Sequence, residues 1–173
     1  MPKMAVHSAR DQTNIRDLVV AIFRANGALI ANGNRLVADL GLTAALWQVL
    51  DALERADGQA TVAEIGRMMG LTRQSVQRSV DRLADRGLAI GLDNPAHKRA
   101  PLIALTQEGR SILQSIHVRE LVSRKKVLAC LEPAEAARAT QLVVAFAQEL
   151  ERQAQDGGTP KVVPLMAGKR DPS

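Results

Sequence analysis

Aromatic residues and cysteine are the scarcest side chains in this sequence. Its 173 residues include one Trp, two Phe, no Tyr and a single cysteine, Cys130. Proteins that stack the bases of single-stranded nucleic acid use aromatic platforms, so this composition argues against such a partner. A single cysteine excludes an intramolecular disulfide bond. A redox-sensing role for Cys130 would require an exposed thiol beside cationic groups.

Groups of catalytic or metal-ligating residues are also missing from the pattern. The three histidines, His7, His97 and His117, are dispersed, and neither a metal-ligand spacing nor a phosphate-binding Gly-rich loop occurs. Catalysis would require clustered acids and bases, or a nucleophile with its base. We therefore expect no enzymatic activity, no cofactor and no bound metal ion.

Long hydrophobic runs are absent as well. The longest ones, such as Leu18–Phe23 and Leu142–Ala147, are far too short to span a bilayer. The first residues lack the apolar core of a signal peptide. We expect a cytoplasmic protein with no membrane partner.

The charge is modestly basic and unevenly distributed. The formal net charge is +5, and residues 61–110 carry eight basic and five acidic side chains. Residues 1–60 carry six of each, and residues 111–173 carry nine and seven. The largest excess therefore lies in the central segment, as expected for a segment that binds nucleic acid. The apolar share of 46% suffices for one folded core built mainly from aliphatic residues.

Residues 61–87 have the pattern of a helix-turn-helix. Thr61 and Glu64 have the spacing of a capping box, and Gly70 lies where a helix ends in a left-handed residue. Thr72 is placed to cap a second helix that ends at Gly87. The apolar positions expected to face the core are Val62, Ile65, Met69, Val76, Val80, Leu83 and Ala84, with Leu71 filling the turn.

The opposite side of the second helix carries polar side chains suited to DNA. Arg, Gln, Ser and Thr hydrogen-bond base edges and phosphates. For this helix alone, a solvated polar face is the alternative interpretation, but two capped helices followed by a hairpin favour DNA binding. The candidate contacts are Thr72, Arg73, Gln74, Ser75, Gln77, Arg78 and Arg82.

A hairpin with a basic tip follows the second helix. Its strands are expected at Leu88–Leu92 and Pro101–Leu105, and Asn94-Pro95 marks the turn between them. The tip carries His97, Lys98 and Arg99, which suit phosphates or a narrow minor groove. A solvated loop that happens to be basic is the alternative. The segment thus predicts a winged helix-turn-helix.

Long amphipathic helices flank this module. The first is expected from Asn14, with Gly27 and Gly33 bending it or ending it near Asn34. Thr43 caps the next helix. Two more helices are expected at 107–130 and after Pro133. The predicted organisation is a flexible lead (1–12), scaffold and dimerisation helices (13–57), a winged module (58–106), C-terminal dimerisation helices (107–156) and a disordered tail (157–173).

The flanking helices carry more apolar side chains than the core of one small winged module can bury. A homodimer would bury them and present two recognition helices to successive major grooves. The predicted fold class is thus mainly α with a small β-hairpin wing, flanked by long dimerisation helices. The predicted partners are double-stranded DNA with an inverted repeat and a second copy of the chain.

Three segments resemble the MarR family of bacterial transcription regulators. They read LGLTAALWQVLDAL from Leu40, then VAEIGRMMGLTRQSVQRSVDRLADRGL, then RAPLIALTQEGR, and the resemblance covers about residues 14–155. It implies homodimeric winged helices that bind pseudo-palindromic DNA, usually as repressors, and are released by small aromatic ligands or oxidants. The family's wing typically carries Asp-x-Arg. Here Arg99 matches this motif, which implies insertion into the minor groove, and His97 replaces the Asp.

A ligand that alters DNA affinity would bind between the helical scaffold and the winged module. Candidate lining residues for a small aromatic effector are Phe23, Trp47, His117 and Arg119. For Trp47 a place in the core is the alternative, and for His117 a partly exposed position on a helix. The alternative function is a winged-helix module that binds protein, or DNA without sequence preference, and has no ligand switch.

Overall fold

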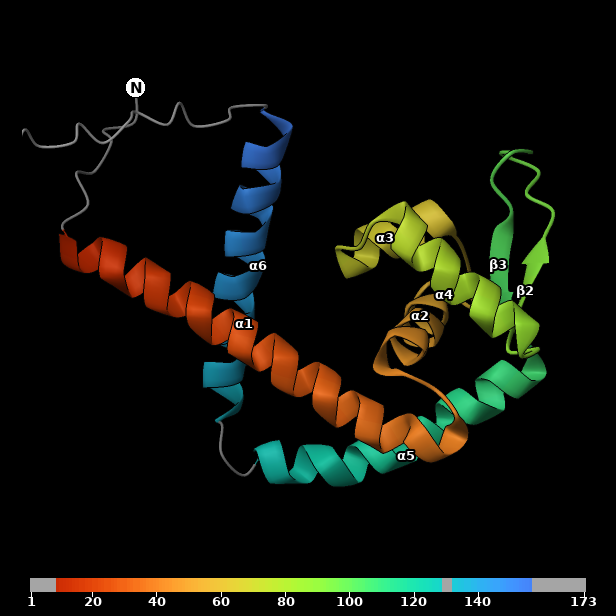
Figure 1. Cartoon of the computed structure of the whole chain (residues 1–173), viewed down its shortest axis with the longest axis horizontal. Helices are drawn as coiled ribbons and strands as arrows, with labels where there is room; N and C mark the ends of the chain where they lie inside the picture. The colour runs from red at the N-terminus through yellow and green to blue at the C-terminus, as the bar shows by residue number, and fades with distance from the viewer. Residues whose placement is uncertain (1–8, 129–131, 157–173) are drawn as a thin grey trace, which may run out of the picture. The chain divides into compact units, whose positions relative to one another are not determined.

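A computed structural model describes residues 9–128 and 132–156 of the chain (Figure 1). The chain divides into two compact units, one up to Ser123 and the other from Arg124 onward. Cys130 and the predicted tail at 157–173 lie outside the described residues.

Helices dominate the described chain, and three short strands form one small sheet. This architecture confirms the predicted fold class, a mainly α winged helix-turn-helix. The elements are α1 (Ala9–Val37), the 3₁₀ turn η1 (Ala38–Leu40), α2 (Ala44–Arg55), β1 (Gln59–Thr61), α3 (Val62–Met69), α4 (Arg73–Asp85), β2 (Ala89–Leu92), β3 (Leu102–Leu105), α5 (Gln107–Leu128) and α6 (Pro133–Gln155).

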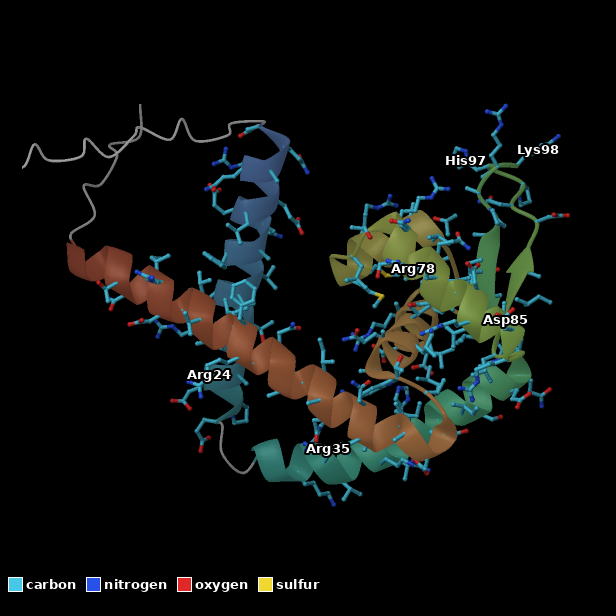
Figure 2. The ribbon with its side chains drawn as sticks, viewed as in Figure 1. Arg24, Arg35, Arg78, Asp85, His97 and Lys98 are labelled. Atoms are coloured by element: carbon cyan, nitrogen blue, oxygen red, sulfur yellow. The ribbon has the colours of Figure 1, made fainter. Side chains whose placement is uncertain are left out.

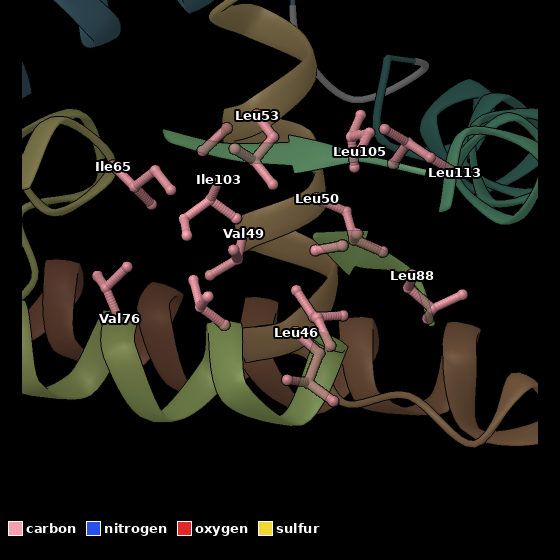
Figure 3. Close-up of a cluster of buried hydrophobic side chains, with 14 of the residues drawn as sticks. Leu46, Val49, Leu50, Leu53, Ile65, Val76, Leu88, Ile103, Leu105 and Leu113 are labelled. Carbon is pink, nitrogen blue, oxygen red and sulfur yellow. The ribbon is translucent and has the colours of Figure 1, made fainter. Parts of the chain in front are cut away.

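Helix α2 is the centre of the first unit's core. Its apolar residues are surrounded by α3, α4, β3 and α5, which each contribute buried aliphatic side chains (Figure 3). Thr43 caps α2 as predicted, because its hydroxyl accepts a hydrogen bond from the Leu46 N–H at 3.3 Å. The largest fully buried members of the core include Leu50, Leu53, Ile65, Leu83, Leu88, Leu113 and Ile116.

Helix α1 is longer than predicted at both ends. It begins at Ala9, inside the predicted lead, and it continues through Gly27 and Gly33 to Val37. The helix therefore ends three residues beyond Asn34. Gly33 is buried, and a Cβ there would lie 3.0 Å from that of Ala44. The absent side chain lets α2 approach closely, so tertiary packing outweighs the low helix propensity of glycine.

The sheet has the strand order β1-β3-β2 with antiparallel pairing throughout. The predicted hairpin is confirmed, with Ala89 opposite Leu105 and Leu92 opposite Leu102. Strand β1 was not predicted. It has three residues and pairs with the other edge of β3, with Ala60 opposite Ile103. This pairing joins the start of the helix-turn-helix to the wing.

The predicted capping box at the start of α3 is confirmed. The Thr61 hydroxyl accepts a hydrogen bond from the Glu64 N–H, and the Glu64 carboxylate accepts one from the Thr61 N–H at 2.8 Å. Hydrogen bonds from the backbone and then the hydroxyl of Thr61 lower the pKa of Glu64. Ionised Glu64 therefore stabilises the fold above its unfolded-state pKa, and this contribution is lost as the pH falls through the lower folded-state pKa.

Replacing Glu64 by glutamine should lower the melting temperature modestly at pH 7, and this deficit should shrink as the pH falls toward the folded-state pKa. Glutamine can still accept the hydrogen bond at this position, so the difference isolates the charge. Thermal unfolding followed by circular dichroism between pH 7 and pH 3 measures it. The exposed Glu151→Gln serves as the control, and a Glu64→Gln deficit that stayed constant with pH would contradict the prediction.

Candidate nucleic-acid interface

Helix α4 has one buried side and one exposed polar side. Val76, Val80 and Leu83 are buried against the core as predicted. Ala84, which was expected to join them, is exposed and lies toward the polar side. Thr72, Arg73, Gln74, Gln77, Arg78 and Arg82 are exposed, and Ser75 is half-buried.

A tight turn sets the start of α4. Gly70 ends α3 with φ +62°, the left-handed conformation predicted for it. The Leu71 N–H donates to the Gly66 carbonyl at 2.9 Å. Thr72 then caps α4, because its hydroxyl accepts from the Ser75 N–H at 3.2 Å. Leu71 does not fill the turn as predicted: it is 41% exposed.

Some polar side chains of α4 already form hydrogen bonds within the protein, and so does Arg86, the residue that caps its C-terminus. The Gln77 side-chain amide donates to Asp81 at 2.8 Å. Arg86 donates to the carbonyls of Gly41 and Leu40, which ties the end of α4 to η1. Arg86 therefore serves the fold, and Gln77 must exchange its partner before it can reach a base.

The remaining cations of α4 are available to a ligand. Among the described residues, no carboxylate forms an ion pair with Arg73, Arg78 or Arg82. Figure 2 shows Arg78 on α4 in the same unit as the wing. Unpaired guanidinium groups on an exposed helix suit guanine edges and phosphates.

Asn94 organises the wing loop between β2 and β3. Its side-chain amide donates to the Ala100 carbonyl at 2.8 Å, and its side-chain oxygen accepts from the Ala96 N–H at 3.1 Å. The His97 N–H closes the turn on the Asn94 carbonyl. These bonds confirm the predicted turn at Asn94-Pro95. His97 and Lys98 consequently lie at the tip of the hairpin (Figure 2), and Arg99 is exposed beside them.

The wing tip and the start of α4 share one basic hollow. Its lining includes Arg73 from α4 together with His97, Lys98 and Arg99 from the loop, and its volume is about 430 Å³. Their proximity arises because β1, β2 and β3 hold the wing beside the helix-turn-helix. A hollow lined by cationic side chains suits a phosphate of the DNA backbone.

The residues predicted to line a ligand pocket lie in different surroundings. Phe23 is 72% exposed on α1, and Trp47 packs against the core with a buried Nε1 that has no hydrogen-bond partner among the described residues. Arg119 donates to Asp39 at 2.6 Å and to the Leu36 carbonyl at 3.1 Å, which joins α5 to η1 and to the end of α1. This hydrogen bond with Arg119 lowers the pKa of Asp39.

A cavity of about 430 Å³ lies between α1, α2 and the α3–α4 turn. None of the four predicted pocket residues lines it. The exposed Leu71, which does not fill the turn, contributes to this lining. The signal in the sequence was Met68 and Leu71, two apolar side chains near the end of α3 that remain exposed in the fold. The lining residues are Asn26, Ile30, Gln48, Asp51, Ala52, Arg55, Met68, Met69 and Leu71.

No single helix of the described segments is long and apolar enough to cross a bilayer. The stretch Thr13–Leu40 and α2 meet the length and composition only when taken together, with a bend of 88° between them.

A family model and several known proteins match this chain. The sequence model of the MarR family matches residues 40–100. The chain is 38% identical over 120 residues to the uncharacterised protein Rv2011c of Mycobacterium tuberculosis, covering 69% of this chain and 82% of that protein. It is 31% identical over 86 residues to the multiple antibiotic resistance protein MarR of Salmonella typhimurium, covering 50% of this chain and 59% of MarR.

A solved structure matches the fold as well. A mutant of Escherichia coli MarR, crystallised with operator DNA, superposes with a TM-score of 0.68 at 25% identity, covering 77% of this chain and 95% of that one. The residues matched by the family model include the whole of α4 and the wing loop. On these grounds the chain belongs to the MarR family of DNA-binding transcription regulators.

Proposed function

We propose that the chain is a homodimeric repressor that binds an inverted-repeat operator and releases it when a small aromatic ligand binds. The observation that carries this proposal is the exposed polar side of α4 next to the basic hollow formed with the wing. In this arrangement α4 enters the major groove, and Arg99 reaches the flanking minor groove while its neighbours contact phosphates. The chain acts on DNA rather than as an enzyme, and its place of action is the cytoplasm.

The unburied apolar side chains of the long helices support a homodimer. Helix α6 spans 23 residues, none of which is buried. Exposed apolar patches of this kind mark interaction surfaces, and a two-fold interface would cover them in both copies. The exposed residues are Ile15, Leu18, Val20, Phe23, Leu29 and Ile30 on α1, Val118, Leu121 and Val122 on α5, and Leu142, Val143, Val144 and Leu150 on α6.

The cavity between α1, α2 and the α3–α4 turn supports a ligand switch. Its volume of about 430 Å³ lies within the usual range for small-molecule sites. The cavity also touches the turn from which α4 starts. A bound ligand can therefore favour one position of α4, the proposed recognition helix, over another. A ligand changes the affinity for DNA only if it binds more tightly to one of two arrangements of the protein, the one that binds DNA or the one that does not.

Selection of duplexes from a random pool tests the proposal. We expect a palindromic winner whose half-sites lie one helical turn apart, about 34 Å, and a dimer by light scattering at micromolar concentration. Selection of a single half-site, or no enrichment over random duplex, would favour the alternative of a module without sequence preference. A monomer in solution would overturn the symmetric arrangement.

Lys98→Ala should weaken binding to all duplexes by a similar factor and reduce the slope of log affinity against log salt by about 1. A lysine that contacts a phosphate releases one condensed counterion and reads no base. Fluorescence anisotropy at several salt concentrations measures the slope. Lys125→Ala, an exposed lysine of α5, is the control, and an equal change in both variants would contradict the phosphate contact.

A further inference from the structure

Three side chains of metal-ligating type converge on the first unit, away from the wing. Asp51 and Glu54 lie on α2, and His117 lies on α5. His117 Nε2 is 3.6 Å from Asp51 Oδ1 and 3.6 Å from Glu54 Oε2. One donor atom from each residue lies within 4.8 Å of the other two. The sequence predicted no metal site, because these residues meet only when α5 packs against α2.

The distances match those of a metal-binding site before the ion enters. With metal–ligand bonds of about 2.0–2.2 Å, neighbouring donor atoms of a tetrahedral zinc site are about 3.4 Å apart. Both histidine–carboxylate distances, at 3.6 Å, are slightly longer than this spacing. A small rotation of the side chains would bring the donor atoms to it. One imidazole and two carboxylates leave a fourth position that water can occupy, since all three side chains are partly exposed.

A neighbouring arginine orients one carboxylate without occupying the oxygen that faces His117. Arg55 Nε lies 2.8 Å from Asp51 Oδ2, whereas Asp51 Oδ1 is the atom directed at the imidazole. Glu54 and Glu120 also interact electrostatically with Arg55. The three carboxylates outnumber the single guanidinium, so the local charge stays negative and favours a cation. Hydrogen bonds of this type commonly fix ligating carboxylates.

We propose that Asp51, Glu54 and His117 bind one divalent transition-metal ion such as zinc, which takes imidazole and carboxylate ligands. The ion joins α2, the central helix of the core, to α5, the helix that follows the wing. The site is separate from the DNA interface and does not depend on the operator proposal. The alternative is that His117 only contacts the two carboxylates and the site holds no metal.

Titration of the full chain with zinc chloride tests the site. We expect one ion per chain by elemental analysis after dialysis, and a melting temperature that rises with zinc concentration, since an ion bound only to the folded state stabilises it. His117→Gln and Glu54→Gln should each weaken zinc binding at least tenfold. His97→Gln removes a histidine from the wing, and Glu108→Gln removes an exposed carboxylate from α5; both should bind zinc as the wild type does.

Two experiments distinguish metal binding at this site from metal binding through the single thiol: absorption spectra with cobalt chloride, and zinc binding by the Cys130→Ser variant. We expect cobalt d–d absorption without a thiolate charge-transfer band, and unchanged zinc binding in Cys130→Ser. Absence of a bound ion, or zinc binding that survives His117→Gln, would overturn the proposal. So would a thiolate band, or loss of binding in Cys130→Ser.

Discussion

Replacing Arg78 by alanine should weaken binding to the selected operator on the order of 5- to 150-fold, or about 1–3 kcal/mol, and relax the choice of base at one position of each half-site. Affinity for random duplex should fall much less. This pattern is expected when a guanidinium reads a base edge, because the wrong base loses the bidentate contact whereas phosphate contacts remain.

The position of Arg78 on α4 supports this expectation. It is exposed and has no carboxylate partner among the described residues, so binding DNA breaks no ion pair. Gln74 and Arg82 are four residues away on either side, and residues with this spacing share one face of a helix. If this face of α4 lies in the major groove, Arg78 faces the base pairs with a polar side chain on either side of it.

Arg35→Ala is the matched control for Arg78→Ala. Arg35 lies on α1 (Figure 2), and its described hydrogen bond is to Asn32 on the same helix. Both substitutions remove one positive charge, so any loss through the overall field should be similar, and the excess loss in Arg78→Ala measures the local contact. Anisotropy titrations of both variants on operator and random duplex decide the matter. Equal losses on the two duplexes would mean that Arg78 contacts phosphate.

Local chemistry explains how much of the recognition helix could be predicted from the sequence. The caps at Thr61 and Thr72 and the left-handed Gly70 depend on residues within one turn of each other, and all three were predicted. The wing turn at Asn94 is equally local. The order of these caps and turns along the chain was enough to predict which side of α4 is polar and where the basic tip of the wing lies.

The features that were missed depend on residues far apart in the sequence. Strand β1 has three residues and no pattern of its own, and it exists because β3 offers a free edge. Helix α1 continues through Gly33 because Ala44 packs there. The meeting of Asp51 with His117 likewise requires α2 and α5 to be side by side. No spacing rule within one helix contains this information.

Gly109→Ala should destabilise the protein by about 3 kcal/mol, although alanine favours a helix over glycine by about 1 kcal/mol. Gly109 is a buried residue in the first turn of α5. A Cβ at this position would lie 2.1 Å from the Leu88 carbonyl oxygen and 3.1 Å from its carbon. Both are backbone atoms, so no side-chain rotation can relieve the clash.

The backbone around Leu88 is fixed by several hydrogen bonds. Its carbonyl accepts from the Thr106 N–H at 3.2 Å, and the Thr106 hydroxyl donates to the Gly87 carbonyl at 2.7 Å. The same hydroxyl accepts from the Gly109 N–H at 3.0 Å. The end of α4, the start of β2, the end of β3 and the start of α5 therefore meet here. To accommodate a methyl group, α5 must move away from the base of the wing.

Gly27→Ala provides the opposite expectation within the same protein. Gly27 is exposed in α1, and a Cβ there would contact nothing within 4 Å. This substitution should stabilise the fold by up to about 1 kcal/mol through helix propensity alone. In thermal unfolding, the Gly109→Ala midpoint should therefore fall by roughly 6–12 °C, while the Gly27→Ala midpoint rises slightly. Gly109→Ala should also weaken operator binding, because the displaced strand carries the wing that lies beside Arg73. A stabilised Gly109→Ala protein with normal operator affinity would mean that α5 and the wing are not in contact through this glycine.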